Sequence, residues 1–320
     1  MQKDIAAKRL MEHPDVAADI INGNIYDGKQ IVKPENLKII SPVSSMKDRK
    51  GKLWENTRDI LAEDYRCGRR YLIWGIENQS DIDNTMPLRV MGSDYGEYHR
   101  QVRRLIAENK RQNNPAYLKR IHDDQKLVPT VTIVLYYGKE WTGPRDLYDM
   151  FDKDDLKFLK PYLSNYKMNL VELRKDKEFY KKLHSDFRLI ARYLALKDDE
   201  KALMEFMEKD KQEIQHVEEF FDMLGSLGNE KIYKNIKATV FAQKEEGAVN
   251  MCLAADGFRR EGRIEVQVEI VLEFLKNVGE ISKDLQERIS GERDLDVLGR
   301  WVRKAAKVSS IEEFEKSMNE

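Results

Sequence analysis

Cysteine and histidine are scarce in this chain of 320 residues. The two cysteines, Cys67 and Cys252, lie far apart in the sequence and lack the close spacing of metal ligands. The five histidines are scattered in the same way. These absences argue against a disulfide framework and against a zinc site built from cysteine and histidine.

Long apolar runs are absent as well. No run approaches the roughly 18 apolar residues of a membrane-spanning helix, and the opening residues Met1–Asp4 do not resemble a signal peptide. Hydrophobic residues make up 41% of the chain and charged residues 35%, which is typical of a water-soluble globular protein with somewhat more charge than usual. We therefore expect a cytoplasmic protein with no membrane partner.

The chain as a whole has little net charge, with a formal value of -1. The charge is nevertheless unevenly distributed, because residues 1–195 sum to +7 and residues 196–320 to -8. Any surface that binds a polyanion is expected in the first region, whereas the second should face solvent or other protein.

One stretch, Tyr71–Gln79, has a sequence that predicts a buried strand with a polar end. Its first six residues are apolar, aromatic or β-branched, and the stretch then stops abruptly in Glu-Asn-Gln. Because side chains alternate along a strand, Glu77 and Gln79 are expected on one face and Asn78 on the other.

A second, more polar segment before this stretch can pair with it. Thr57–Ile60 is a candidate strand, and the polar residues Asp64–Arg70 are expected to reverse the chain between the two strands. In such a hairpin, Asp59 near the start of one strand and Glu77 near the end of the other lie at the same edge of the sheet.

Two carboxylates that converge at a sheet edge repel each other unless a cation lies between them. Oxygen ligands of this kind suit Mg²⁺ or Mn²⁺, and a bound divalent ion lowers the pKa of a water molecule and stabilises charge on a phosphoryl oxygen. The alternative is that Asp59 and Glu77 are simply solvated residues at strand ends. The spacing by itself leaves both interpretations open.

Asp59 followed by Glu77, Asn78 and Gln79 resembles the motif of the PD-(D/E)XK nuclease superfamily, in which an Asp on one strand precedes Glu-x-Lys on the next. The sequence is more similar to the Rpn family of recombination-promoting nucleases and putative transposases, whose members carry Glu-x-Gln at that place. Further segments up to about Ala195 match this family in the same order, namely Lys8–Leu10, Pro14–Asp19, Gly75–Gln79, Met86–Arg89 and Leu135–Gly138.

The resemblance implies a restriction-endonuclease-like fold and metal-dependent cleavage of DNA, linked to recombination or mobile elements. Asp59 and Glu77 would hold Mg²⁺ or Mn²⁺ and, with Gln79, form the catalytic set. Gln79 stands where the superfamily carries lysine, and an amide can neither carry a charge nor act as a base. Arg89 matches a position shared within the family and is expected to contact the nucleic acid. Asp19, on the predicted first helix, matches an acidic residue that members of the superfamily lend to the metal site, with a solvated helix face as the alternative.

Helical and strand patterns continue on both sides of this motif. A helix is predicted from Asn84, a possible cap, to about Gln112, and the β-branched run Val128–Gly138 predicts a central strand. Met168–Leu173 predicts a further strand, and Lys177–Leu196 has helical spacing. The predicted helix after Asn84 has an apolar side made of Leu88, Met91, Tyr95, Tyr98, Val102, Leu105 and Ile106.

From Asp198 onward the sequence predicts helices only, separated by glycines. Ser309–Phe314 predicts a capping box at the start of the last helix. We therefore predict an α/β (α+β) fold with two parts: a nuclease-like domain over residues 1–196, with a mixed sheet flanked by helices, and an all-helical C-terminal region over residues 197–320. We expect that helical region to be the contact of any homodimer.

Two functions follow from these patterns. The first is a metal-dependent DNA endonuclease that uses Asp59, Glu77 and Gln79. The second is a nuclease-fold protein that binds nucleic acid or protein and cuts weakly or not at all, as Gln79 and the near-zero net charge suggest. Retention of both carboxylates favours the endonuclease, because paired negative charge does not help a surface that only binds DNA.

Overall fold

The computed structural model describes residues 2–40, 43–47, 53–112, 120–228, 235–237 and 249–318. Contacts between residues divide the chain into two compact units. The first comprises Met1–Leu203 with Gln215–Leu227, and the second Met204–Ile214 with Gly228–Glu320. The predicted domain boundary after residue 196 stays a prediction, since contacts alone do not show which parts of the chain fold independently.

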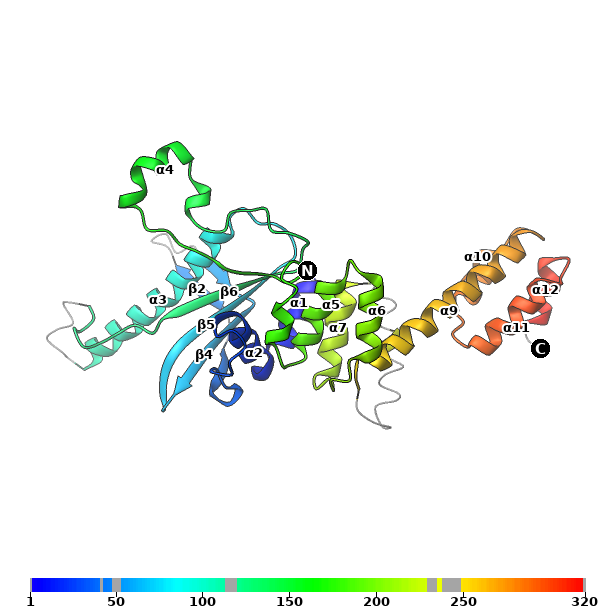
Figure 1. Cartoon of the computed structure of the whole chain (residues 1–320), viewed down its shortest axis with the longest axis horizontal. Helices are drawn as coiled ribbons and strands as arrows, with labels where there is room; N and C mark the ends of the chain where they lie inside the picture. Colours follow the sequence, from blue (N-terminus) through cyan, green and yellow to red (C-terminus); the bar gives the residue numbers. More distant parts are fainter. Residues whose placement is uncertain are drawn as a thin grey trace. The chain divides into compact units, whose positions relative to one another are not determined.

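The first unit contains a five-stranded sheet with the order β1, β4, β5, β6, β7 (Figure 1). Its strands are β1 (Leu37–Ile40), β4 (Ile60–Arg66), β5 (Arg69–Gln79), β6 (Thr130–Tyr136) and β7 (Asn169–Glu172). β4 pairs with β1 on one side and with β5 on the other, and both pairings are antiparallel, whereas β5, β6 and β7 run parallel to one another. β2 (Val43–Lys47) and β3 (Leu53–Thr57) form a separate antiparallel pair. The predicted mixed sheet is confirmed.

The hairpin of β4 and β5 differs from the predicted one in where the chain reverses. The turn is the dipeptide Cys67-Gly68, with φ angles of 50° and 73°, and backbone of this kind matches the twist of the flanking strands. The polar residues that suggested a longer reversal lie within the strands, where they have partners: Arg70 Nη1 lies 2.6 Å from Glu63 Oε1. The first strand therefore runs from Ile60 to Arg66 rather than over Thr57–Ile60.

Helices cover both faces of the sheet. Trp74 of β5 packs edge-on against the ring of Tyr26, directly after α2 (Pro14–Ile25). Thr132 of β6 pairs with Gly75, the residue after Trp74, so its side chain lies on the other face of the sheet. There its hydroxyl donates a hydrogen bond to Asp94 of α3 (Met86–Arg111). Where the structure describes the first unit, its other helical segments are α1 (Gln2–Met11), η1 (Pro34–Asn36), η3 (Tyr148–Met150), α4 (Lys153–Leu159), η4 (Lys160–Tyr162), η5 (Phe179–Lys182), α5 (Phe187–Leu196) and α7 (Val217–Leu227).

The helix α3 turns a different side inward from the one predicted. Leu88 and Tyr95 of the predicted apolar side are 42% and 58% exposed, while Asp94 and Gln101 are buried. Each of these inward polar groups has specific partners: Gln101, for example, exchanges hydrogen bonds with the backbone N–H and C=O of Val128. Tertiary hydrogen bonds thus outweigh the apolar periodicity of this helix.

Helices joined by short loops make up the described part of the second unit, which contains no strand. Its helices are α9 (Met251–Lys276), α10 (Lys283–Gly291), α11 (Leu295–Ala305) and α12 (Ile311–Ser317), while α6 (Glu200–Lys209) crosses the division between the units. Leu285, Leu298, Trp301 and Phe314 lie in one core. The predicted start of the last helix is confirmed, because the Ser310 hydroxyl accepts a hydrogen bond from the Glu313 N–H at 3.3 Å. The all-helical C-terminal region, α5 to α12, is confirmed as well.

Among the described helices, none combines the length and the apolar character that crossing a membrane requires.

Candidate active site

The edge of the sheet brings Asp59 and Glu77 together. Ile60 pairs with Ile76 in the antiparallel register of β4 and β5, so Asp59, one residue before β4, lies opposite Glu77. The Asp59 carboxylate also accepts a hydrogen bond of 2.6 Å from the backbone N–H of Asn78. The two acids therefore lie at one edge, as the hairpin predicted, while their chemical roles stay predictions.

Burial and mutual repulsion make it hard for Glu77 to hold a negative charge. Its side chain is only 4% exposed. Burial, followed by the charge of Asp59, raises the pKa of Glu77 to about 8, although Arg89 and Arg58 act in the opposite direction. At neutral pH this carboxyl therefore keeps a proton unless a cation takes the proton's place.

Arg89 lies beside Glu77 and Gln79, at the start of α3. Its Nη2 is 3.6 Å from Glu77 Oε2, and its Nη1 is 2.8 Å from Asp83 Oδ2 and 3.5 Å from Gln79 Oε1. The Arg89 side chain remains 45% exposed. The structure therefore brings all four predicted site residues together, and it adds Asp83 as the acid that orients Arg89.

The amide of Gln79 is held by the loop that follows β5. Its Nε2 donates to the backbone carbonyl of Asp81 at 2.8 Å, so its Oε1 is left on the side of Arg89. Asn78 is directed to the opposite face of the sheet, where its Oδ1 accepts a bond of 2.7 Å from the Tyr137 hydroxyl. This confirms the predicted separation of Glu77 and Gln79 from Asn78.

Beneath the pair lies a buried polar network that the sequence analysis did not predict. The Asp94 carboxylate accepts hydrogen bonds from Arg58, Thr132 and Tyr166, the bond from the Thr132 hydroxyl being 2.7 Å long. Arg58 is 4% exposed, and its Nη1 has no hydrogen-bond partner among the residues that the structure describes. Within the network, the charge of Arg58 lowers the pKa of Glu77, whereas the charge of Asp94 raises it.

Glycine at position 75 makes room for this network. A Cβ atom on Gly75 would lie 2.6 Å from Thr132 Oγ1 and 2.9 Å from Arg58 Nη1, closer than real atoms approach. A glycine inside a strand is a sign of close approach by other groups. That was the one signal in the sequence that could have indicated the network.

Asp19 takes neither of the two roles considered for it. The residue is 3% exposed, which excludes a solvated helix face. Its Oδ2 accepts hydrogen bonds from the backbone N–H groups of His184 and Ser185, at 2.8 and 2.7 Å. Asp19 therefore holds the chain that leads into α5.

The residues at the sheet edge fit one kind of metal site. Among the described residues, no group of three or more His, Cys, Asp or Glu side chains could hold a metal ion. Mg²⁺, however, is often bound by only one or two carboxylates, with water and substrate phosphate completing its shell. Asp59 and Glu77 fit that arrangement, and the raised pKa of Glu77 shows that the position favours added positive charge.

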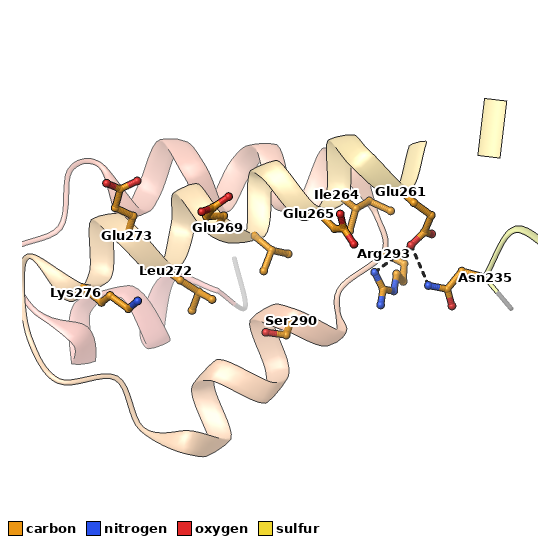
Figure 2. A pocket seen from close by; sticks show the side chains of 11 residues that line it. Asn235, Glu261, Ile264, Glu265, Glu269, Leu272, Glu273, Lys276, Ser290 and Arg293 are labelled. Carbon is orange, nitrogen blue, oxygen red and sulfur yellow. Dashed lines mark hydrogen bonds and ion pairs between the residues drawn. The ribbon is translucent and has the colours of Figure 1, made fainter. Parts of the chain in front are cut away.

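The second unit carries a separate acidic groove of about 540 Å³ between α9 and α10 (Figure 2). Four glutamates line one wall of the groove, at four-residue spacing along α9. Ser290 and Arg293 lie across from them, and Arg293 Nη1 is 3.6 Å from Glu261 Oε2. The groove contains none of the predicted site residues. The four glutamates are Glu261, Glu265, Glu269 and Glu273.

Comparison with protein-family models, with curated proteins and with solved structures finds no match to this chain. The likeness to Rpn nucleases therefore stays a resemblance of motifs.

Proposed function

We propose that this protein is a metal-dependent DNA endonuclease that hydrolyses phosphodiester bonds, as the resemblance to the Rpn family implies. The observation that carries the proposal is the placement of buried Glu77 opposite Asp59 at the end of a mixed sheet. A buried pair of acids costs free energy and is expected where a cation or a proton compensates the charge. A purely structural strand end has no need of such a pair.

Each residue of the site has a role in this proposal. Asp59 and Glu77 would bind the divalent ion, and Arg89, which is partly exposed, faces the phosphate and stabilises its negative charge. Gln79 donates to the Asp81 carbonyl, so its own carbonyl is available to orient a water molecule. The bound ion would supply Lewis-acid activation of that water.

A nuclease-fold binding module is the second candidate. It is favoured by the protonated state of Glu77, because a pair that carries one proton is stable without any metal. It is also favoured by Gln79, which cannot remove a proton from water. In this case the protein would hold nucleic acid or protein partners without cutting DNA.

The decisive experiment is cleavage of supercoiled plasmid by the full chain in Mg²⁺, in Mn²⁺ and in EDTA. Wild type should nick the plasmid only with metal, and Asp59→Asn and Glu77→Gln should each lose at least about 100-fold in rate. Glu269→Gln, which neutralises an exposed acid of the groove on α9, is the matched control and should nick like wild type.

Two outcomes would count against the proposal. If wild type binds the plasmid but leaves it intact in both metals, the binding module replaces the endonuclease. If Glu269→Gln loses nicking while Asp59→Asn keeps it, the chemistry belongs to another part of the chain.

A further inference from the structure

The connection from β6 to β7 forms an exposed arm, here defined as residues 146–167. An isolated bridge between Asp146 and Lys167 closes its base, and α4 and η4 form its tip. Every residue from 157 to 164 is exposed to solvent. Phe158 is 74% exposed and Tyr162 86%, the highest values among the large hydrophobic residues that the structure describes. Figure 1 shows α4 on this excursion, away from the strands of the sheet.

The base of the arm is joined to the candidate active site. The arm begins after β6, whose end is beside the end of β5, since Tyr136 pairs with Gln79. In the segment that returns from the tip toward β7, the hydroxyl of Tyr166 donates to Asp94, in the network beneath Glu77. Trp141, just before the arm, packs into the same apolar cluster as Met86 at the start of α3. The bridge at the base lies just before β7, which begins opposite Ile133, so the arm is linked to the candidate site through Tyr166 and the network beneath Glu77 rather than through the strand ends themselves.

The tip of the arm has the chemistry of a surface that binds unpaired bases. A helix of seven residues gains too little from its own hydrogen bonds to be stable alone, and α4 has no buried residue. Residues 156–163 read Leu-Lys-Phe-Leu-Lys-Pro-Tyr-Leu and hold two lysines, whereas the acids of the tip, Asp152, Asp154 and Asp155, are confined to the start of α4. Aromatic rings that alternate with cations bind single strands by stacking on bases while the cations contact phosphates. A partner with an apolar protein surface would not make use of Lys157 and Lys160.

We propose that this arm stacks on unpaired bases of DNA, with Phe158 and Tyr162 contacting the bases and Lys157 and Lys160 the backbone. The inference rests on the proposed endonuclease function and defines its substrate as DNA with a single-stranded or locally opened segment. Stacking at the arm would hold the strand on the side of the sheet where Tyr166 joins the network beneath Glu77, so cutting would occur near the unpaired stretch.

Binding can be measured separately from cutting, by fluorescence anisotropy of labelled oligonucleotides with the full chain in EDTA. Wild type should bind a 20-nucleotide single strand more tightly than the matching blunt duplex. Phe158→Ala and Tyr162→Ala should each weaken single-strand binding roughly tenfold and leave duplex binding nearly unchanged. Lys157→Gln with Lys160→Gln should reduce the slope of log affinity against log salt by about 1.4.

The control is Tyr71→Ala, which removes a ring that is 50% exposed near the other end of β5. Its single-strand affinity should equal that of wild type. Melting temperatures of the arm variants should equal that of wild type, because neither α4 nor η4 has a buried residue.

The proposal is overturned if the arm variants bind the single strand as tightly as wild type. It is also overturned if Phe158→Ala with Tyr162→Ala dissociates a dimer in sedimentation equilibrium while DNA affinity stays unchanged, since the arm would then contact a second copy. Failure of the endonuclease is recognised separately, because plasmid nicking would be absent even where the arm variants lose single-strand affinity.

Discussion

Acidic side chains lie together in both units, but in opposite surroundings. In the first unit, Glu77 is 4% exposed and lies opposite Asp59 at the edge of the sheet. In the second, Glu265, Glu269 and Glu273 follow one another along α9 and are all exposed. Burial removes the water that would screen one carboxylate from another, whereas water and salt screen the charges on α9.

This difference shows why the number of acids alone does not identify a site. The exposed row costs little free energy and therefore requires no ligand. The buried pair is costly unless a proton or a cation compensates it, so its properties should respond to pH, to metal and to neighbouring charges. Four experiments can sharpen or break this contrast.

The largest effect is expected from Asp94→Ala, because it leaves the guanidinium of Arg58 buried without its carboxylate. Removing one partner of a buried ion pair typically costs about 3–5 kcal/mol, so the free energy of unfolding should fall by that amount in urea titrations. Glu265→Ala, from the exposed row, should change it by less than about 0.5 kcal/mol. Similar losses in the two variants would remove the contrast between buried and exposed acids.

The next effect is the pH dependence of stability that Glu77 causes. Its pKa is about 8 in the folded chain against an ordinary 4.5, so between these values the folded state keeps a proton that the unfolded state loses. Stability should therefore fall as pH rises through this window, by up to about 1.4 kcal/mol per pH unit. Glu77→Gln should remove that slope and be more stable than wild type at pH 8.

Thermal unfolding from pH 5 to pH 8 measures the slope. Glu269→Gln should keep the slope of wild type, because an exposed acid is not expected to titrate differently on folding. An equally steep slope in Glu77→Gln would show that another group causes it.

A smaller effect is expected from Mg²⁺, which competes with the proton on Glu77. Added Mg²⁺ should stabilise wild type by about 1–3 kcal/mol at concentrations well above its dissociation constant, and more at pH 8 than at pH 6. Asp59→Asn should remove the stabilisation. If Glu269→Gln removed it instead, the ion would bind the row on α9 and the comparison would be reversed.

The smallest effect is expected within the exposed row itself. Like charges four residues apart on a helix repel weakly, so Glu269→Gln should stabilise the second unit by about 0.3 kcal/mol at low salt. The gain should vanish in 1 M NaCl, where exposed charges are screened. A larger gain that persists in high salt would mean that the row is less exposed than its position on α9 indicates.

Much of the fold could be predicted because its patterns are local. The apolar run before Glu77 identified β5, the β-branched run after Val128 identified β6, and strand alternation placed Glu77 and Gln79 on one face. Glycine and capping residues likewise marked the helical region and its last helix. These signals need only the residue and its neighbours within a few positions.

The turn and the inward side of α3 could not be predicted in the same way. Asp64, Arg66 and Arg70 looked like turn residues, but they are strand residues, because Arg66 pairs with Asp64 and Arg70 with Glu63. Asp94 lies on the inward side of α3 because Arg58, Thr132 and Tyr166 meet it from three other segments.

The sequence by itself determined the class of fold, the strand that ends in Glu77 and the acids available at its edge. Only the tertiary structure decided that Glu77 is buried opposite Asp59, that Arg58 lies beneath it and that Asp19 bonds the backbone before α5. The physical reason is that periodicity reports which side of an element is apolar, whereas the charge state of a buried acid depends on partners that arrive from distant parts of the chain.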